Sequence, residues 1–298
     1  MFGNSLPALL ALSLLGAAPP APAERAAASK DIAAACGERD GWSDPAPPAF
    51  IHGRSWYVGT CGITVVLVET SDGLVLIDTG PVEAAPHVLA NIKALGFDPR
   101  QVKWVLMTHE HFDHVGGMAE VLRATGAKLL TGAGAAEVMR TGKPAADDPQ
   151  GSWLADSPME PVKVSRILPH RGKLSVGDTR FTIYQNATHS PGSTSWSWRS
   201  CEAGRCLTIA LADSNSTIST GDYHFSDHPE RVEAAREGLR VMERLPCDLM
   251  LTPHPGQSDL LERLSGTAPL AAPNACVAYS ASGSMRLADR LAKEAEAK

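Results

Sequence analysis

The sequence predicts an α/β protein in which two β-sheets pack together with helices on the outside. Strand-like runs precede a helical stretch in the first half of the chain, and the same order recurs in the second half. This succession is typical of layered sheets covered by helices. With 298 residues and 44% hydrophobic content, the chain is long enough to bury one large core or two modest ones.

The first half is predicted to form a strand meander, a helix and then a strand-loop-helix-strand unit. Apolar residues at helical spacing stop at Gly96, which indicates a helix over 81–95. The short apolar run over 102–107 has the composition of a buried strand and leads directly into a histidine-rich loop. The other elements predicted here are strands over 55–58, 62–69, 73–78 and 128–130 and a helix over 118–124.

The second half repeats this order, with short strands before a long helix. The helix is predicted over 229–245, where it precedes the last strand. The strands predicted here cover 173–174, 182–184, 195–198, 207–211 and 249–252.

The N-terminal residues predict an export signal. Residues 1–23 carry no charged side chain, contain an apolar stretch and end in Ala21-Pro22-Ala23, a small-x-small cleavage pattern. Residues 24–48, rich in Ala and Pro, are expected to form an extended arm, and 49–298 the folded domain. We therefore expect a periplasmic monomer that has no membrane attachment once the signal is removed.

The charge balance bears on the class of partner. The formal net charge is −6 and the pI is about 5.9, so the chain lacks the excess of basic residues that neutralises phosphate backbones. A nucleic-acid partner is therefore disfavoured, and a small-molecule substrate is expected.

Six cysteines behind an export signal predict disulfides. They can pair in fifteen ways, but the segment from Cys201 to Cys206 is typical of a hairpin turn closed at its base. That pair leaves two sequential pairs, Cys36 with Cys61 and Cys247 with Cys276. Metal ligation by cysteine is the competing interpretation, and the absence of any Cys-x-x-Cys spacing argues against it.

Four potential metal ligands lie within six residues at the end of the strand predicted over 102–107. His109 and His111 are two apart, so in extended backbone their rings can point the same way. Asp113 and His114 follow the bend and can face a second point a few ångströms away. The spacing therefore predicts two adjacent metal ions rather than a solvated loop.

Two metals need more ligands than this loop offers. His189, in a Gly- and Pro-containing turn, and His254, directly after a strand, are the candidates because sites on layered α/β proteins collect at strand ends. The remaining histidines lack such a context and are interpreted as surface or loop residues: His52, His87, His170, His224 and His228.

The sequence resembles a known family, the metallo-β-lactamases, and most closely their subclass B3. The resemblance extends from about residue 57 to 252 and beyond. It is carried by His109-x-His111-x-Asp113-His114-x-Gly116-Gly117, by Thr188-His189-Ser190-Pro191-Gly192-Ser193-Thr194-Ser195-Trp196, by Thr252-Pro253-His254-Pro255-Gly256, and by 58–62 and 245–248.

The resemblance implies a four-layer αββα sandwich that binds two Zn²⁺ ions and hydrolyses β-lactam antibiotics (penicillins, cephalosporins and carbapenems), which confers resistance. It implies the ligand set His109, His111 and His189 for the first zinc, and Asp113, His114 and His254 for the second. It also implies the Cys247–Cys276 disulfide. The expected nucleophile is a metal-bound hydroxide that Asp113 helps to orient, with His114 beside it at the reacting centre.

Several positions near the site have two interpretations. Ser214 and Ser216 resemble the serines that hold the substrate carboxylate, or they are ordinary capping hydroxyls. Phe112 and Trp153 either form apolar walls of the site or are ordinary packing residues without a role in binding. Glu110 stands where a small residue is more usual in the family. Its carboxylate either supports the metal ligands from behind or points into solvent water, and we expect that it points into water.

Asp213 carries the main alternative function. In glyoxalase II, lactonases and related hydrolases of the same fold, an aspartate near this point bridges both metals. A one-residue change of alignment would give Asp213 that role, and the substrate would then be a thioester or lactone. A zinc-binding periplasmic protein without catalysis is the third possibility. The export signal, the disulfides and the Ser-Thr-Ser-Trp sequence after His189 favour the β-lactamase.

Overall fold

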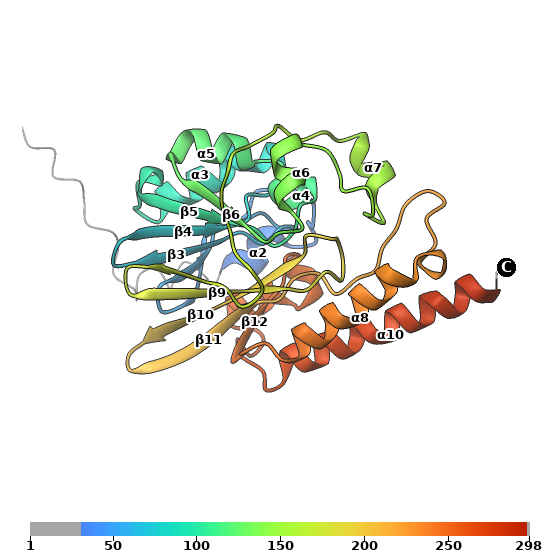
Figure 1. Cartoon of the computed structure of the whole chain (residues 1–298). Helices are drawn as coiled ribbons and strands as arrows, with labels where there is room; N and C mark the ends of the chain where they lie inside the picture. The colour runs from blue at the N-terminus through green and yellow to red at the C-terminus, as the bar shows by residue number, and fades with distance from the viewer. Residues whose placement is uncertain (1–30, 297–298) are drawn as a thin grey trace, which may run out of the picture.

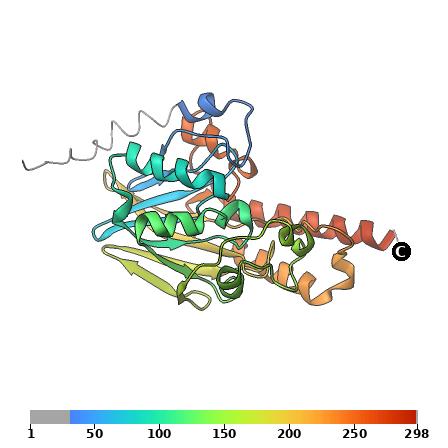
Figure 2. The same ribbon diagram turned by 90° about the horizontal axis from the view of Figure 1, so that it is seen from above.

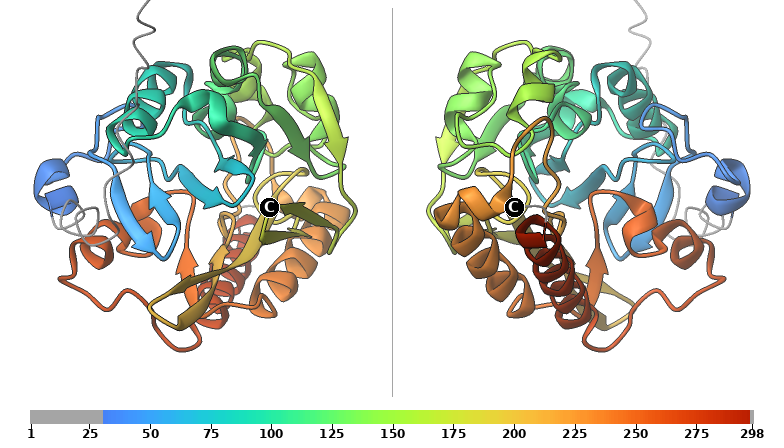
Figure 3. Two further views of the ribbon diagram at one scale, coloured as in Figure 1. Left: turned by 90° about the vertical axis from the view of Figure 1, so that its left-hand side faces the viewer. Right: turned by 90° about the vertical axis from the view of Figure 1, so that its right-hand side faces the viewer.

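The computed structural model describes residues 31–296 and contains two β-sheets that face each other, with helices on the outer side of each sheet (Figure 1). End-on views show the two sheets between an upper and a lower group of helices (Figure 3). The order of layers is helix, sheet, sheet, helix. This confirms the predicted α/β class and the four-layer αββα sandwich.

The first sheet has seven strands in sequence order. Its neighbours pair antiparallel from β1 to β4 and parallel from β4 to β7. The strands are β1 (Ala49–His52), β2 (Ser55–Tyr57), β3 (Val66–Thr70), β4 (Gly73–Ile77), β5 (Val102–Leu106), β6 (Lys128–Thr131) and β7 (Val164–Ile167).

The second sheet has five strands in the order β12-β11-β10-β9-β8. Only the β11–β12 pair is parallel. The strands are β8 (Lys173–Val176), β9 (Thr179–Gln185), β10 (Thr194–Glu202), β11 (Arg205–Leu211) and β12 (Leu249–Leu251).

The α-helices cover the outer faces and the connections. Seen from above, α3 and α5 lie over the first sheet (Figure 2), and α8 and α10 pack on the second (Figure 1). The helices are α2 (Ile32–Cys36), α3 (Ala85–Ala94), α4 (Phe112–Val115), α5 (Met118–Thr125), α6 (Ala136–Thr141), α7 (Gly151–Ala155), α8 (Pro229–Glu243), α9 (Leu260–Ser265) and α10 (Ala275–Glu296).

The central strands are buried on both faces, which explains their nearly continuous apolar sequence. In β3, Val66 and Val68 join the core between the sheets, whereas Leu67 packs under the helices. In β4 the same alternation places Ile77 between the sheets and Leu76 outside. Because side chains of a strand alternate between its faces, each strand contributes to two apolar layers.

The elements that were not predicted from the sequence include β1, β7 and α10, besides the short helices α2, α4, α6, α7 and α9. The exposed residues of β7 leave it without an apolar pattern, and the Ala-rich sequence of α10 resembles an unstructured end. The strand predicted over 62–69 begins only at Val66. Before it, the Tyr57 hydroxyl donates to the carbonyls of Thr60 and Ile63, which holds a tight loop instead.

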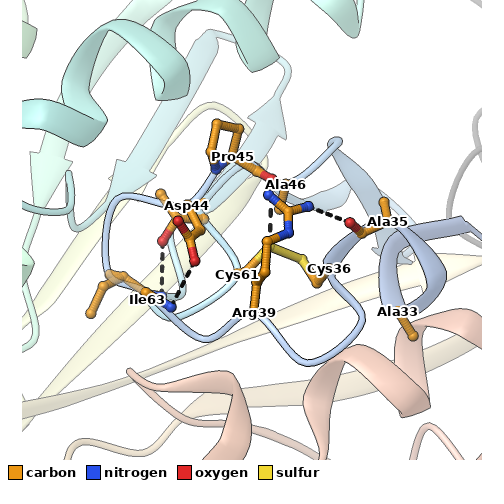
Figure 4. Close-up of a disulfide and its surroundings, with 12 residues drawn as sticks. Ala33, Ala35, Cys36, Arg39, Asp44, Pro45, Ala46, Cys61 and Ile63 are labelled. Atoms are coloured by element: carbon orange, nitrogen blue, oxygen red, sulfur yellow. Dashed lines mark hydrogen bonds between the residues drawn. A yellow bond between two sulfur atoms is a disulfide. The ribbon is translucent and has the colours of Figure 1, made fainter.

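All three predicted disulfides are present, and the described residues contain no free cysteine. They join Cys36 to Cys61, Cys201 to Cys206 and Cys247 to Cys276. Figure 4 shows the Cys36–Cys61 bridge beside Arg39 and Asp44. It ties the N-terminal segment to the loop before β3.

The segment predicted as an extended arm over 24–48 is not extended throughout. Within its described part the helix α2 buries Ile32 and Cys36, and the Ala33 amide donates to Ser265 Oγ at 3.0 Å. The prediction missed this short helix because an Ala-rich sequence of five residues shows little periodicity.

The predicted signal over 1–23 lies outside the described residues. Among residues 31–296, no helix has the length and apolarity needed to span a bilayer.

Candidate metal centre

The six predicted ligands converge at one edge of the sandwich, where several strands end. His109 follows β5, Asp113 and His114 lie on the single turn of α4, and His254 follows β12. His189 lies in the loop between β9 and β10. We call these residues the metal floor: His109, His111, Asp113, His114, His189 and His254.

Three histidine rings of the metal floor surround one point. The ring centroids of His109, His111 and His189 are 4.7–4.8 Å apart, and one ligand nitrogen from each lies within 4.8 Å of the others. All three are buried, and His109 Nε2 has no hydrogen-bond partner. A buried nitrogen without a partner is costly, so this convergence fits a bound metal ion.

The other three residues form a second group beside the first. His114 Nε2 lies 3.1 Å from Asp113 Oδ2 and 3.3 Å from His254 Nε2. His254 Nε2 lies 3.5 Å from the same Asp113 oxygen. The ring centroids of His109 and His114 are 4.2 Å apart, so the two groups adjoin.

Each histidine of the metal floor has an outer partner near one ring nitrogen and faces the centre with the other. The outer partner is hydrogen-bonded except at His114, whose Nδ1 lies beside Asp78 without a hydrogen bond. Three outer partners are carboxylates: Asp213 on His109 at 2.9 Å, Asp148 on His111 at 3.0 Å and Asp78 on His114 at 3.5 Å. Two are main-chain carbonyls: Ser216 on His189 at 3.0 Å and Gly62 on His254 at 3.1 Å. An outer acceptor fixes the imidazole tautomer and leaves the inner nitrogen free to ligate.

The electrostatics of the pocket keep most of these imidazoles neutral. Burial lowers the pKa of His189 to about 3 and that of His254 to about 4, and it lowers the pKa of His109 well below its ordinary value. At His114 burial acts in the same direction, but the Asp113 and Asp78 carboxylates outweigh it and raise its pKa to about 10. Neutral imidazole is the form that binds metal.

Asp148 and Gln150 are among the site residues that were not found from the sequence. Asp148 holds His111, and its other oxygen accepts from the Gln150 amide at 2.8 Å. The Gln150 side-chain nitrogen lies 3.3 Å from His189 Nε2. Both residues belong to a loop before α7 that has no motif, and only the folded chain brings it over the histidines.

Asp213 lies behind His109 and not between the two groups. Its Oδ1 contacts His109 Nδ1, the ring nitrogen that points away from His111 and His189. Burial raises the pKa of Asp213 to about 7. This placement corresponds to an outer partner of a ligand and not to a bridge between metals.

The expectation that Glu110 points to water is wrong. Its side chain is buried, and its two oxygens accept from Ser190 Oγ and from the Gly192 amide, both at 2.8 Å. Consecutive side chains of extended backbone point in opposite directions, so Glu110 faces away from its neighbours' rings and into the loop after His189.

The two predicted substrate serines have different surroundings. Ser214 is buried, and its hydroxyl has no hydrogen-bond partner. The Ser216 hydroxyl lies 3.0 Å from His189 Nδ1, so it contacts a residue of the metal floor. Between them, Asn215 donates to the Tyr279 carbonyl and to Ser282 Oγ, which anchors this loop on α10.

Three aromatic side chains border the metal floor, and we call them the aromatic rim. Phe112 and Trp153 are in edge contact, with ring centroids 5.0 Å apart. Trp42, not singled out from the sequence, lies 5.7 Å from Phe112 and 6.1 Å from the His254 ring. Trp42 and Trp153 are each 37% exposed, so they pack together and still present a surface to solvent.

Of the histidines expected at the surface, His52 is a correction. It is buried in β1, where its ring lies 3.4 Å from Glu202. His87 is partly buried in α3 and contacts the Ala46 carbonyl at 2.8 Å. His170 and His224 are exposed and His228 is half-exposed, as expected. None of these five belongs to the metal floor.

The donor set of the metal floor suits zinc. Imidazole nitrogens with a carboxylate are ligands that zinc accepts in catalytic sites, and the orphaned His109 nitrogen marks where one ion fits. The model of the metallo-β-lactamase superfamily matches residues 58–263. The chain belongs to this superfamily.

Solved structures of metallo-β-lactamases are similar to this chain over most of its length. It is 51% identical to the metallo-β-lactamase MIM-1 from Novosphingobium pentaromativorans, with a TM-score of 0.87 over 89% of this chain and 98% of that one. MEM-A1, a subclass B3 metallo-β-lactamase from a soil metagenome library, is 32% identical, with a TM-score of 0.82 over 87% and 100%.

A curated relative has a different name. The hydroxyacylglutathione hydrolase of Anaeromyxobacter dehalogenans is 30% identical over 66% of this chain, and the match spans 62% of that protein's length. The superfamily therefore includes relatives of this chain named for two different reactions.

Proposed function

We propose that this chain is a subclass B3 metallo-β-lactamase that hydrolyses the β-lactam amide bond with two zinc ions. The observation that carries the proposal is the metal floor, where five imidazoles each turn one nitrogen to the centre and four of them form a hydrogen bond outward through the other. The subclass of MEM-A1 and the near-complete overlap with MIM-1 support the substrate class.

His109, His111 and His189 would hold one zinc, and Asp113, His114 and His254 the other. When bound, zinc supplies a water molecule whose pKa is lowered to about 7 and a Lewis acid that polarises the carbonyl group. The chain's own contribution is orientation, since outer acceptors orient the imidazoles of His109, His111, His189 and His254 before any metal binds.

Asp113 and His114 are the proposed catalytic residues. The Asp113 carboxylate is nine-tenths buried yet stays ionised, because the adjacent His114 and His254 hold its pKa below the ordinary range despite the opposing effect of burial. An ionised carboxylate at this position can orient the attacking water by accepting its hydrogen bond. His114 holds Asp113 in place at 3.1 Å.

Substrate contacts would come from the loop that carries Ser214 and Ser216 and from the aromatic rim. The buried, unpaired Ser214 hydroxyl is suited to donate to the carboxylate that β-lactams carry. Ser216 would assist, although its hydroxyl also contacts His189. Phe112, Trp153 and Trp42 offer an apolar wall for the rest of the molecule.

The place of action is proposed to be the periplasm, after removal of residues 1–23, with the chain acting as a monomer. The three disulfides support this because such bridges persist in oxidising compartments. Hydrolysis there would confer antibiotic resistance.

Thioester hydrolysis is the second candidate, because of the hydroxyacylglutathione hydrolase relative. A bridging aspartate is the feature that would favour it. Asp213 is instead bonded to the outward nitrogen of His109, which favours the β-lactamase.

The test is a substrate panel on the purified zinc-loaded protein. We expect turnover of penicillins, cephalosporins and carbapenems that a chelator abolishes and added zinc restores. Turnover of S-lactoylglutathione or a lactone with no β-lactam hydrolysis would overturn the proposal.

A further inference from the structure

The loop that carries His189 is held from two sides by buried charged side chains. Glu110 lies on one side and Arg231 on the other, 1% and 3% exposed respectively. Neither belongs to the metal floor. Burying a charge costs free energy unless hydrogen bonds offset the cost, so each contact is expected to have a specific consequence for this loop.

Glu110 connects the His109–His111 segment to the backbone after His189. Its carboxylate accepts from Ser190 Oγ and from the Gly192 amide at 2.8 Å each. A Cβ at Gly192 would lie only 2.3 Å from Glu110 Oε2, so glycine is needed for this approach. One side chain therefore links the segment of the first two histidines to the loop of the third, in addition to the Thr194 amide, which donates to the Thr108 carbonyl at 2.7 Å.

Arg231 holds the backbone just before His189. From α8 its guanidinium donates to the carbonyls of Ala187 at 3.1 Å and Thr188 at 3.2 Å. No carboxylate among residues 31–296 forms an ion pair with it. The planar fork of an arginine thus serves two consecutive carbonyls, a geometry that lysine reproduces only in part.

We propose that Glu110 and Arg231 are positioning residues that set the zinc affinity of the His109–His111–His189 site and leave the second site largely unaffected. The second site depends on other contacts, because His254 is held by the Gly62 carbonyl and its loop by the Thr64 amide, which donates to Pro253 O at 2.7 Å. The inference rests on the proposed two-zinc function.

The test compares zinc release to a competing chelator from the wild type, Glu110→Gln and Arg231→Lys. One of the two zinc ions should be lost at roughly 10- to 100-fold lower chelator concentration in Glu110→Gln, with a smaller shift in Arg231→Lys. The second zinc should be released as in the wild type. Ser190→Ala, which removes one contact to Glu110 without changing charge, should move the same zinc by a smaller factor.

Matched controls make the same two changes at the surface. Glu160→Gln and Arg236→Lys each alter an exposed ion pair and should release both zinc ions as the wild type does. Wild-type release from all three test variants, or equal weakening of both zinc ions, would overturn the inference alone. A wild type that binds fewer than two zinc ions would overturn the proposed function instead.

Discussion

The metal floor and the aromatic rim are adjacent but are built in different ways. Every residue of the floor except His254 is buried, and four of its five histidines have a hydrogen-bonding partner behind them. The rim consists of three partly exposed rings from three separate segments: the N-terminal arm, α4 and α7.

This difference separates two properties of the enzyme. The floor is fixed by strand ends and outer partners, so changes there should alter metal binding and the rate of chemistry. The rim is fixed mainly by packing, so changes there should alter which substrates bind. Loops placed on a rigid scaffold commonly carry such variable contacts.

The largest expected effect comes from removing one ligand at each half of the metal floor. His189→Ala and His254→Ala should each lower kcat/KM for a cephalosporin on the order of 10²-fold or more, because metal contributes several kcal/mol to transition-state stabilisation. Steady-state kinetics with zinc analysis checks this. The exposed His224→Ala is the control, and wild-type kcat/KM in either ligand variant would break the assignment.

A smaller effect is expected when an outer partner is changed. Asp213→Asn keeps the shape but weakens the hydrogen bond to His109, so zinc affinity should fall about 10- to 100-fold while two ions still bind at saturation. Zinc titration of the metal-free protein measures this. If a full equivalent of zinc is missing at saturation, Asp213 is itself a ligand.

The sequence predicted the metal floor better than its surroundings. Three of its ligands and Asp113 lie within six residues, and such density reveals chemistry without knowledge of the fold. Asp148 and Trp42 have no such signal, because each reaches the site only through a long loop that the fold brings across. Glu110 was misjudged for the same reason, since its partners Ser190 and Gly192 lie 80 and 82 residues away.

At the aromatic rim the expected change is in binding. Trp42→Ala removes a ring that contacts Phe112 and Trp153, so KM for β-lactams with large apolar side chains should rise on the order of tenfold with kcat nearly unchanged. Zinc content should stay at the wild-type value. The exposed Met285→Ala serves as the control. A loss of zinc from Trp42→Ala would contradict the claim that changes in the aromatic rim leave metal binding unaffected.

The smallest effect on activity is expected far from both regions. The Cys201–Cys206 bridge closes the β10–β11 hairpin at the end of β10 opposite to the His189 loop. Replacing both cysteines with serine should cost roughly 2 kcal/mol of unfolding free energy or less, because the closed loop is short. Urea denaturation measures this cost, and kcat/KM at 25 °C should match the wild type. A tenfold drop in kcat/KM would show that the hairpin reaches the site.

The most direct test of the two-zinc floor is the metal content of the purified wild-type protein after dialysis against trace zinc, determined by elemental analysis alongside β-lactam turnover. The proposed function predicts two zinc ions per chain, with activity that disappears on chelation and returns as zinc is restored. A stable content of one zinc or none in a protein that still hydrolyses β-lactams at full rate would contradict the account.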